Sequence, residues 1–407
     1  MDSLTQIVLG AAVGEATLGR RVGNRAIVWG GIAGTLPDLD VLSGLVTDPM
    51  SALVYHRAFT HSLPFAFLVA PLLGIAVNRL YGGRSIPLRT ALLIPLCMLG
   101  FLVLLYVGSA LMPIEVFQLP QIVLLIGAVF WGIAGVFALR QRLRKHKDLM
   151  RNASIAHWTL LFFLCVVTHP LLDCFTAYGT QFFEPFSAAR LAWNTISVAD
   201  PLYTLPFLLC LVGGARRGRG SGARRKWNIA GLVISSTYLL LTVVNHFNVR
   251  SVMEDTLAAR NLAAQQYLVS PTLLNNVLWS ATARTSGDTY YVGQYSLLDD
   301  ERAFGPFTLV PGNHDWLTPY AEDRDVRILR WFSQGYYGVL PRDSGYLQVS
   351  DLRYGLIGED PNRPSSYIFS WKVDTSGGTA RVVQEFAGPQ EDREEMLGDM
   401  WERLKGR

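Results

Sequence analysis

The sequence predicts a mainly α-helical membrane bundle of about six to eight helices, followed by a soluble C-terminal α+β domain. Half of the 407 residues are hydrophobic and only 17% are charged, a composition unlike that of an ordinary soluble protein. Several apolar stretches approach the ~20 residues that a helix needs to cross a bilayer. After residue 247 these stretches end, and short Tyr-, Val- and Ile-rich runs bounded by turn residues begin.

The composition also excludes several classes of protein. Such a high apolar content excludes a disordered chain, and four cysteines in 407 residues exclude a disulfide-stapled secreted module. The cysteines lie in or beside apolar runs without CxxC spacing, so we interpret them as core residues rather than metal ligands. Lys and Arg collect in short loops between apolar runs, which favours a membrane and argues against a nucleic-acid partner.

The predicted helices of the membrane domain, residues 1–247, follow one another along the chain. Two Gly- and Ala-rich segments, 4–19 and 26–36, suit close helix packing. Longer apolar segments that span or nearly span the hydrocarbon core follow at 63–80, 90–112, 121–139, 153–172, 201–215 and 227–247. No signal peptide is evident, because the first residues carry acidic and amide side chains instead of a basic run.

The basic loops predict the orientation of this domain. Loops 140–151 and 216–226 are rich in Lys and Arg and are therefore expected in the cytoplasm. Counting helices outward from them places the acidic and histidine motifs, together with the C-terminal domain, on the opposite face. We therefore expect a multi-pass protein of the bacterial inner membrane, with its site on the extracytoplasmic side.

The C-terminal domain, residues 248–407, differs from the rest in charge and pattern. It holds 16 Lys and Arg against 22 Asp and Glu, whereas residues 1–247 hold 20 against 10. The pattern predicts strands at 288–297, 345–351 and 366–373, and helices at 251–268 and 391–405. We expect an extracytoplasmic α+β domain, and the sequence does not identify a protein partner for it.

Three short motifs combine acids and histidines at predicted helix ends. They are Asp38 with Asp40, His56 with His61, and His169 with Asp173. An extended Asp-x-Asp points both carboxylates the same way, and residues four apart on a helix share a face. Taken singly, each aspartate suits a helix cap and each histidine suits a satisfied polar group in the bundle. Together, at one membrane depth, they are costly unless they pair with each other or with a cation.

These motifs therefore predict a metal centre. Mixed imidazole and carboxylate donors suit Zn²⁺, and also Mn²⁺ or Fe²⁺, and six ligands are enough for two or three ions. Such a centre activates water for an in-line displacement at phosphorus. We expect Asp38 or Asp40 to bridge the ions, with Arg57 neutralising a substrate oxygen. Glu15 is either a neighbour of the ligands or a helix-packing residue.

The motifs also resemble a known family. In order they read MDSLTQ, GAAVGE, GTLPDLD, HRAFTHS, THPLLD with TAYGT, and DPLYTLP. This set, over roughly residues 1–215, resembles the YdjM-type inner-membrane metal-dependent hydrolases, and PTLLNNVLW and DLRYG resemble longer members. The resemblance implies a distant link to zinc-dependent phospholipase C-like phosphoesterases, and it implies the six residues above as ligands. Gln6 stands where shorter relatives have a histidine, and Ala58 where a glycine is common.

We therefore expect a hydrolase of a lipid or lipid-linked phosphate ester. The alternative is a metal-stabilised membrane scaffold whose C-terminal domain binds a partner. A transporter is disfavoured because the acids and histidines lie at helix ends rather than near the midplane. Three features have simpler interpretations: Asp200 as a helix cap, Gly312-Asn313-His314-Asp315 as a turn, and 176–180 as either a turn or a pocket lining.

Overall fold

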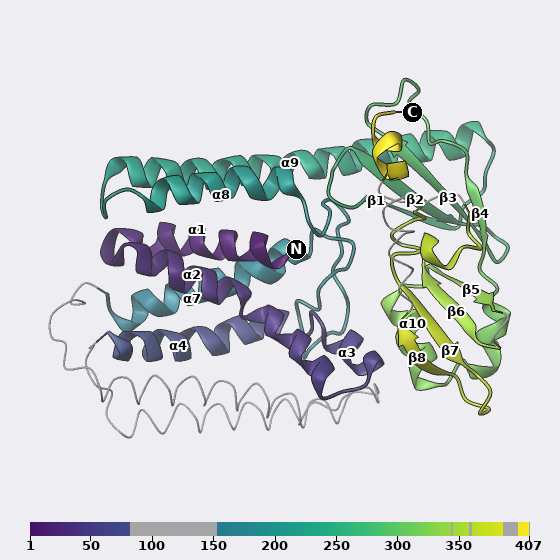
Figure 1. The fold of residues 1–407 in the computed structure, drawn as a ribbon, viewed down its shortest axis with the longest axis horizontal. Coiled ribbons are helices and arrows are strands. Elements are labelled where there is room, and N and C mark those ends of the chain that lie inside the picture. The colour runs from purple at the N-terminus through teal and green to yellow at the C-terminus, as the bar shows by residue number, and fades with distance from the viewer. Residues whose placement is uncertain (82–152, 343–344, 358–359, 386–397, 407) are drawn as a thin grey trace.

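The computed structural model describes residues 1–81, 153–342, 345–357, 360–385 and 398–406. Among these residues, the bundle helices lie side by side, with the C-terminal domain at one end of them (Figure 1). They are α1 (Ser3–Val22), α2 (Asn24–Thr35), α4 (Leu63–Leu80), α7 (Ile155–Asp173), α8 (Pro201–Ala215) and α9 (Gly222–Ala259). Three short elements connect α2 to α4: η1 (Pro37–Leu45), α3 (Pro49–Tyr55) and η2 (Phe59–His61). The expected spans 90–112 and 121–139 and the basic loop 140–151 lie outside the described residues.

Among the described residues, α4, α7 and α9 are long and apolar enough to cross a membrane. Helix α8 is apolar but shorter. Helix α2 has only 12 residues, well short of the ~20 that a span requires. The described part of the chain therefore supports three membrane helices, and it does not support the expected count of six to eight.

Helices α1 and α2 pack backbone against backbone. A Cβ added at Gly10 would lie 2.3 Å from the carbonyl oxygen of Gly30, and one added at Gly34 would lie 2.5 Å from that of Gln6. Small residues permit this close approach, as the Gly- and Ala-rich sequence of the two segments predicts. The packing brings the end of α2, and the η1 segment after it, beside the start of α1.

Helix α9 continues through residue 247 to Ala259, so the expected domain division falls within one helix. The expected helix 251–268 ends early, because Asn261 adopts a positive φ of 53° and strand β1 begins at Gln266. Residues 398–404 are helical, and residue 405 lies in a turn. Residues 391–397 of the expected helix 391–405 lie outside the described residues.

The C-terminal domain contains two four-stranded antiparallel sheets with strand orders β1-β2-β3-β4 and β5-β6-β7-β8. The first sheet comprises β1 (Gln266–Pro271), β2 (Leu278–Arg284), β3 (Thr289–Ser296) and β4 (Thr308–Pro311). After η3 (His314–Tyr320) and α10 (Arg324–Phe332), the second comprises β5 (Tyr337–Pro341), β6 (Leu347–Asp351), β7 (Ser370–Asp374) and β8 (Arg381–Glu385), with η4 (Pro364–Ser366) before β7. Three of these strands, β3, β6 and β7, overlap the predicted ones.

The second sheet packs against the short elements that cover the end of the bundle. Met50 and Val54 of α3 and Tyr178 of the α7–α8 loop share one hydrophobic cluster with Phe332 and Trp371 of the C-terminal domain. Burial of large apolar side chains of this kind stabilises the contact by roughly 1.5–3 kcal/mol per side chain. The C-terminal domain is therefore fixed directly over the loops that carry the sequence motifs.

Candidate metal centre

Three chain segments deliver the candidate ligands to the end of the bundle that faces the C-terminal domain. Asp38 lies in η1, which begins at Pro37 where the helix pattern of α2 stops. His61 directly precedes α4, whose N-terminus is capped by Ser62 and continues with a proline in the first turn. His169 and Asp173 lie one turn apart at the end of α7. Each ligand is thus placed by a helix boundary that the local sequence sets.

Four side chains converge on one point. The Nε2 atoms of His61 and His169 are 3.0 Å apart. Each Nε2 lies 3.4–3.5 Å from Oδ1 of Asp38 and 3.4 Å from Oδ2 of Asp173. All four atoms lie within 4.8 Å of one another. Ligands held tetrahedrally at 2.0–2.2 Å from Zn²⁺ are separated by about 3.3–3.6 Å, so the four imidazole–carboxylate distances suit a four-ligand site.

Hydrogen bonds to the far side of each imidazole fix this arrangement. Nδ1 of His61 lies 3.0 Å from Oδ2 of Asp40, and Nδ1 of His169 lies 2.5 Å from the carbonyl oxygen of Gly34. An acceptor on Nδ1 selects the tautomer whose Nε2 is free to ligate. The Gly34 carbonyl reaches His169 because α1, α2 and α7 pack closely, which the sequence motifs alone do not reveal.

Asp40 and His56, two of the six predicted ligands, lie beside this set rather than within it. Oδ1 of Asp40 contacts Nδ1 of His56 at 2.9 Å, and Oδ2 accepts the backbone N–H of Arg57 at 2.7 Å. Asp40, one of the two carboxylates that we expected to bridge ions, thus positions His61 and the loop around it. Among the described residues, Asp38, His61, His169 and Asp173 are the ligands that converge and could hold a metal ion.

Arg57 lies between the ligand set and the C-terminal domain. Its φ is 59°, an uncommon value for a residue other than glycine, and the hydrogen bond from its N–H to Asp40 holds it there. Its Nη1 donates to Thr176 Oγ1 at 2.9 Å, and its Nε lies 3.4 Å from Oδ2 of Asp173. The guanidinium therefore reaches the edge of the ligand set, as its predicted role requires.

The carboxylates of the set stabilise positive charge, which His61 carries when it is protonated. Burial opposes protonation of His61, but the charge of Asp40 and hydrogen bonds with Asp173 and Asp38 outweigh it and raise the pKa of His61 to about 10. Burial likewise opposes ionisation of Asp38, yet hydrogen bonds to His169 and His61 hold its pKa well below the usual range. The carboxylates thus remain charged and attract a positive charge between them.

Two buried carboxylate oxygens of the set have no hydrogen-bond partner in the described structure. They are Oδ2 of Asp38 and Oδ2 of Asp173; the second is one of the four converging atoms and has only ion-pair contacts, at 3.4 Å, with Nε2 of His61, Nε2 of His169 and Nε of Arg57. A buried polar atom without a partner is costly, and a bound cation would satisfy it. The donor set and its unpartnered atoms therefore fit a divalent metal ion.

The structure also places the residues whose roles the sequence left open. Gln6 touches the set, because its Nε2 donates to Oδ1 of Asp173 at 3.0 Å; the same oxygen contacts the amino group of Met1. Glu15 lies away from it and pairs with Arg224 of α9 at 2.5 Å. Asp200 caps α8, as predicted, by accepting the N–H groups of the next helical turn.

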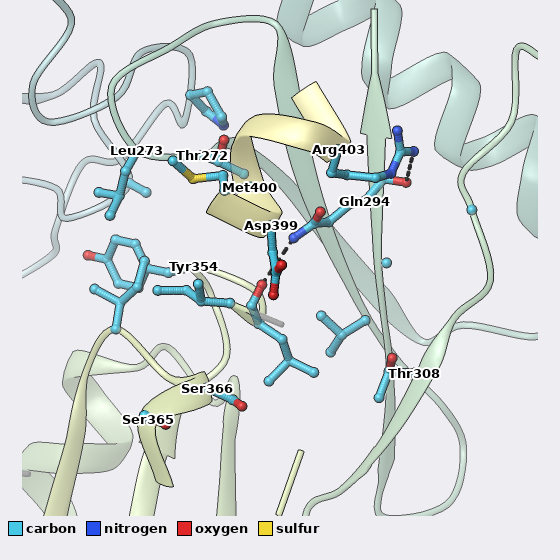
Figure 2. Close-up of a pocket in the computed structure, with 18 of the residues that line it drawn as sticks. Thr272, Leu273, Gln294, Thr308, Tyr354, Ser365, Ser366, Asp399, Met400 and Arg403 are labelled. Carbon is cyan, nitrogen blue, oxygen red and sulfur yellow. Dashed lines mark hydrogen bonds between the residues drawn. The ribbon is translucent and has the colours of Figure 1, made fainter. Parts of the chain in front are cut away.

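Other predicted features lie near the site or in the C-terminal domain. Within 176–180, Thr176 accepts from Arg57 and Gly179 adopts a positive φ of 75° in a turn, so the segment both turns and touches the site. Asn313 is left-handed and precedes η3, which agrees with a turn at the GNHD string. A cavity of about 950 Å³ lies between the two sheets rather than at the ligand set (Figure 2).

Comparison with known proteins identifies the family. The family model of the YdjM inner membrane protein matches residues 1–112 and 122–249, the part of the chain that contains all four converging ligands. The chain belongs to the YdjM inner membrane protein family. The resemblance drawn from the motifs is thereby confirmed, and with three apolar helices it indicates a membrane protein. The YdjM match ends at residue 249, so the two sheets lie beyond it.

The similarity to a curated relative is more distant. The chain is 26% identical over 218 residues to the uncharacterized protein YfhP of Bacillus subtilis. This alignment covers 52% of the chain and 62% of YfhP, less than two thirds of that protein's length. No solved structure matches the chain.

Proposed function

We propose that this YdjM-family protein is an inner-membrane metal-dependent hydrolase that cleaves a phosphate ester of a lipid or lipid-linked substrate. The observation that carries the proposal is the convergence of Asp38, His61, His169 and Asp173 at spacings suited to one divalent cation. Imidazole and carboxylate donors favour Zn²⁺, with Mn²⁺ or Fe²⁺ as alternatives. This assignment reduces the expected two or three ions to one.

The residues around the ligand set would each support hydrolysis. A divalent cation held there supplies Lewis acidity and lowers the pKa of bound water to about 7. Asp40 and the Gly34 carbonyl keep the two imidazoles in the ligating tautomer through their Nδ1 atoms. Arg57 would bind an anionic oxygen of the substrate, because its guanidinium lies at the edge of the set and its Nε has no hydrogen-bond partner.

The charge distribution supports an extracytoplasmic site in a multi-pass protein. Gln6, near the start of α1, contacts the ligand set, whereas Arg20 and Arg21 lie in the last turn of the same helix. The helix thus runs from the site to a basic end, which the positive-inside rule assigns to the cytoplasm. The site and the C-terminal domain would then both lie outside.

Exposed apolar side chains beside the site support a lipid substrate. On η1, next to Asp38, Leu39 is 40% exposed, Val41 59% and Leu45 80%. An apolar surface of this kind next to a polar site is typical of membrane or ligand contact. A lipid headgroup could approach the ligands from this side while its acyl chains remain in the bilayer.

The test is hydrolysis of a panel of phosphate esters by the purified protein in detergent, before and after chelation and metal restoration. We expect metal-dependent cleavage of at least one ester, abolished in His169→Ala and retained in His314→Ala. The latter removes a histidine that pairs with Asp288 in the C-terminal domain and serves as the matched control. Equal activity of the two variants would refute the assignment.

A specific observation also favours the alternative of a metal-stabilised scaffold. Four protein ligands are enough to fill a tetrahedral shell, as they do in structural zinc sites. A scaffold predicts that metal removal lowers the unfolding temperature while no ester is cleaved. A hydrolase predicts cleavage as well, so the panel separates the two functions.

A further inference from the structure

Three arginines from distant parts of the chain gather beside the ligand set, around Tyr178. The Cζ atoms of Arg57 and Arg190 lie 4.9 and 4.7 Å from the centre of the Tyr178 ring. Arg353, which follows β6, lies 4.8 Å from the Phe332 ring, which itself packs against Tyr178. Nη1 of Arg353 also reaches the carbonyl oxygen of Ala177 at 3.4 Å. The C-terminal domain therefore contributes to this cluster directly.

The cluster carries more positive charge than its neighbours neutralise. Arg353 is paired with Asp351, with Nη2 2.6 Å from Oδ2. Arg190 donates only to backbone carbonyls, those of Tyr178, Gly179 and His56, and no carboxylate in the described residues forms an ion pair with it. Arg57 faces Asp173, which belongs to the ligand set. A guanidinium stays charged in proteins, and the charge of Arg190 faces carbonyl oxygens and the rings of Tyr178, Trp331 and Phe332, so it is available to an anion.

Glu184 does not supply that anion. The side chain is buried, and burial raises its pKa to about 8 against the opposing charge of Arg190. Glu184 is therefore mainly neutral near pH 7. Burial also lowers the pKa of Arg190 to about 10, with Arg353 and Arg57 adding to the effect while Tyr178 opposes it. Burial is the main cause of both shifts.

Three donors of the cluster have no hydrogen-bond partner in the described structure. They are Nη1 of Arg190, Oη of Tyr354 and Nε of Arg57, which has only the 3.4 Å ion-pair contact with Oδ2 of Asp173; all three are inaccessible to solvent. Tyr354 follows Arg353, whose guanidinium lies 5.6 Å from its ring, and also lines the cavity between the sheets (Figure 2). Buried donors are normally satisfied, and each unpartnered donor is costly.

We propose that Arg57, Arg190 and Tyr354 form a binding site for a phosphoryl group, completed by the C-terminal domain. The proposal rests on the proposed function and specifies its substrate as a phosphoryl compound held beside the ligand set. Guanidinium groups bind phosphate oxygens through paired, charge-assisted hydrogen bonds. Because Nε of Arg57 lies 3.4 Å from Oδ2 of Asp173, a group bound there adjoins the ligands. Arg353, fixed by Asp351, acts as a positioning residue for Tyr354.

Binding of inorganic phosphate to the full-length protein, measured by calorimetry with and without metal, tests this site. We expect Arg190→Gln to weaken phosphate binding by at least about tenfold, since a charge-assisted hydrogen bond contributes roughly 1.5–3 kcal/mol. Arg190→Lys should retain part of the affinity, and Tyr354→Phe should lose less than Arg190→Gln. Metal content should be unchanged in all three variants.

Arg302→Gln is the matched control, because Arg302 is an exposed arginine of the same domain, 57% exposed and 3.8 Å from Asp255. Its phosphate affinity should equal that of the wild type. Unchanged unfolding temperatures and metal content would show that the Arg190 variants fold. Phosphate affinity in Arg190→Gln equal to that of the control, or no phosphate binding by the wild type with or without metal, would overturn the proposal.

The same assay distinguishes a lipid headgroup from a soluble phosphate compound. The protein is reconstituted in phosphatidylcholine vesicles with or without phosphatidic acid. Displacement of inorganic phosphate by phosphatidic acid would support the site and assign it to a lipid phosphate, whereas phosphate binding that is unaffected by phosphatidic acid would support a soluble phosphoryl compound. Because the phosphate assay also runs on metal-free protein, failure of the metal centre and failure of the arginine site give different results.

Discussion

The helical region and the C-terminal domain both place histidine against aspartate, but only the helical region leaves ring nitrogens free to ligate. His314 of the C-terminal domain contacts Asp288 through Nδ1 at 2.8 Å and the Tyr337 carbonyl oxygen through Nε2 at 2.9 Å. In both His61 and His169, Nδ1 contacts a fixed acceptor. Their two Nε2 atoms point toward each other. A histidine–aspartate pair therefore indicates a metal site only where one nitrogen remains available.

An ion pair within the helical region is more deeply buried than one that joins this region to the C-terminal domain. Glu15 and Arg224 form a buried pair that joins α1 to α9, with side chains 7% and 4% exposed. Asp48 and Arg324 join α3 to α10 with side chains 44% and 37% exposed. Buried charges depend strongly on their partners, whereas exposed charges are solvated with or without them.

Glu15→Gln should destabilise the protein most. It leaves the Arg224 guanidinium buried without a counter-charge, a change that costs about 3–5 kcal/mol in comparable buried pairs. The unfolding midpoint in denaturant should fall accordingly, while metal content should stay at the wild-type level because Glu15 lies away from the ligand set. Loss of metal with intact stability would instead place Glu15 in the centre.

Glu184→Gln should change the pH dependence of stability. The carboxyl has a pKa of about 8 in the folded protein against 4.5 ordinarily, so between these values the folded state holds a proton that the unfolded state has lost. Stability therefore falls as pH rises from 5 to 8, by at most about 4 kcal/mol for this group. In Glu184→Gln, the unfolding temperature should no longer fall in this way between pH 5 and 8. Glu301→Gln, a control at an exposed position, should show the same fall as the wild type.

Asp40→Asn tests whether the carboxylate beside the ligands supports them. An asparagine can still accept a hydrogen bond through its Oδ1 but lacks the negative charge that orients His61. Replacing a residue that hydrogen-bonds to a metal ligand typically lowers metal affinity about 10–100-fold. Competition with a chromophoric chelator measures the affinity. Loss of metal as complete as that of a ligand variant would show that Asp40 itself binds the ion.

Arg324→Gln should have the smallest effect. The Arg324–Asp48 pair is partly exposed, and pairs in contact with solvent contribute about 0–1 kcal/mol. We expect an unfolding midpoint close to that of the wild type at high salt and slightly lower at low salt. A loss as large as that of Glu15→Gln would contradict the contrast between buried and exposed pairs.

The sequence predicts the elements and the ligand types better than it predicts which ligands share one point. Some features of the site are local and can be read from the residues. They are the end of α2 before Pro37, the start of α4 after Ser62, and the i, i+4 spacing of His169 and Asp173. Asp40 lies outside the converging set because of the way the segment 36–62 folds. The spacing of residues in the sequence does not predict that fold. The Gly34 carbonyl and Arg190 carry no motif, so only the packing of distant segments reveals them.

The extent of the helices shows the same limit. Apolar length predicts α4 and α7 closely, because a span is set by local hydrophobicity. The end of α9 at Ala259 depends on backbone geometry near Asn261 and on pairing of β1 with β2, and apolar length carries no information about either. The predicted strands that were found, β3, β6 and β7, lie in runs rich in Tyr, Val and Ile that are bounded by turn residues.

Elemental analysis of the purified protein tests the central claim most directly. We predict one divalent ion per chain in the wild type, the same content in a His157→Ala/His314→Ala double variant, and none in His61→Ala/His169→Ala. Both double variants remove two histidines, so only position distinguishes them. A wild type without stoichiometric metal, or a His61→Ala/His169→Ala variant that keeps it, would contradict the account.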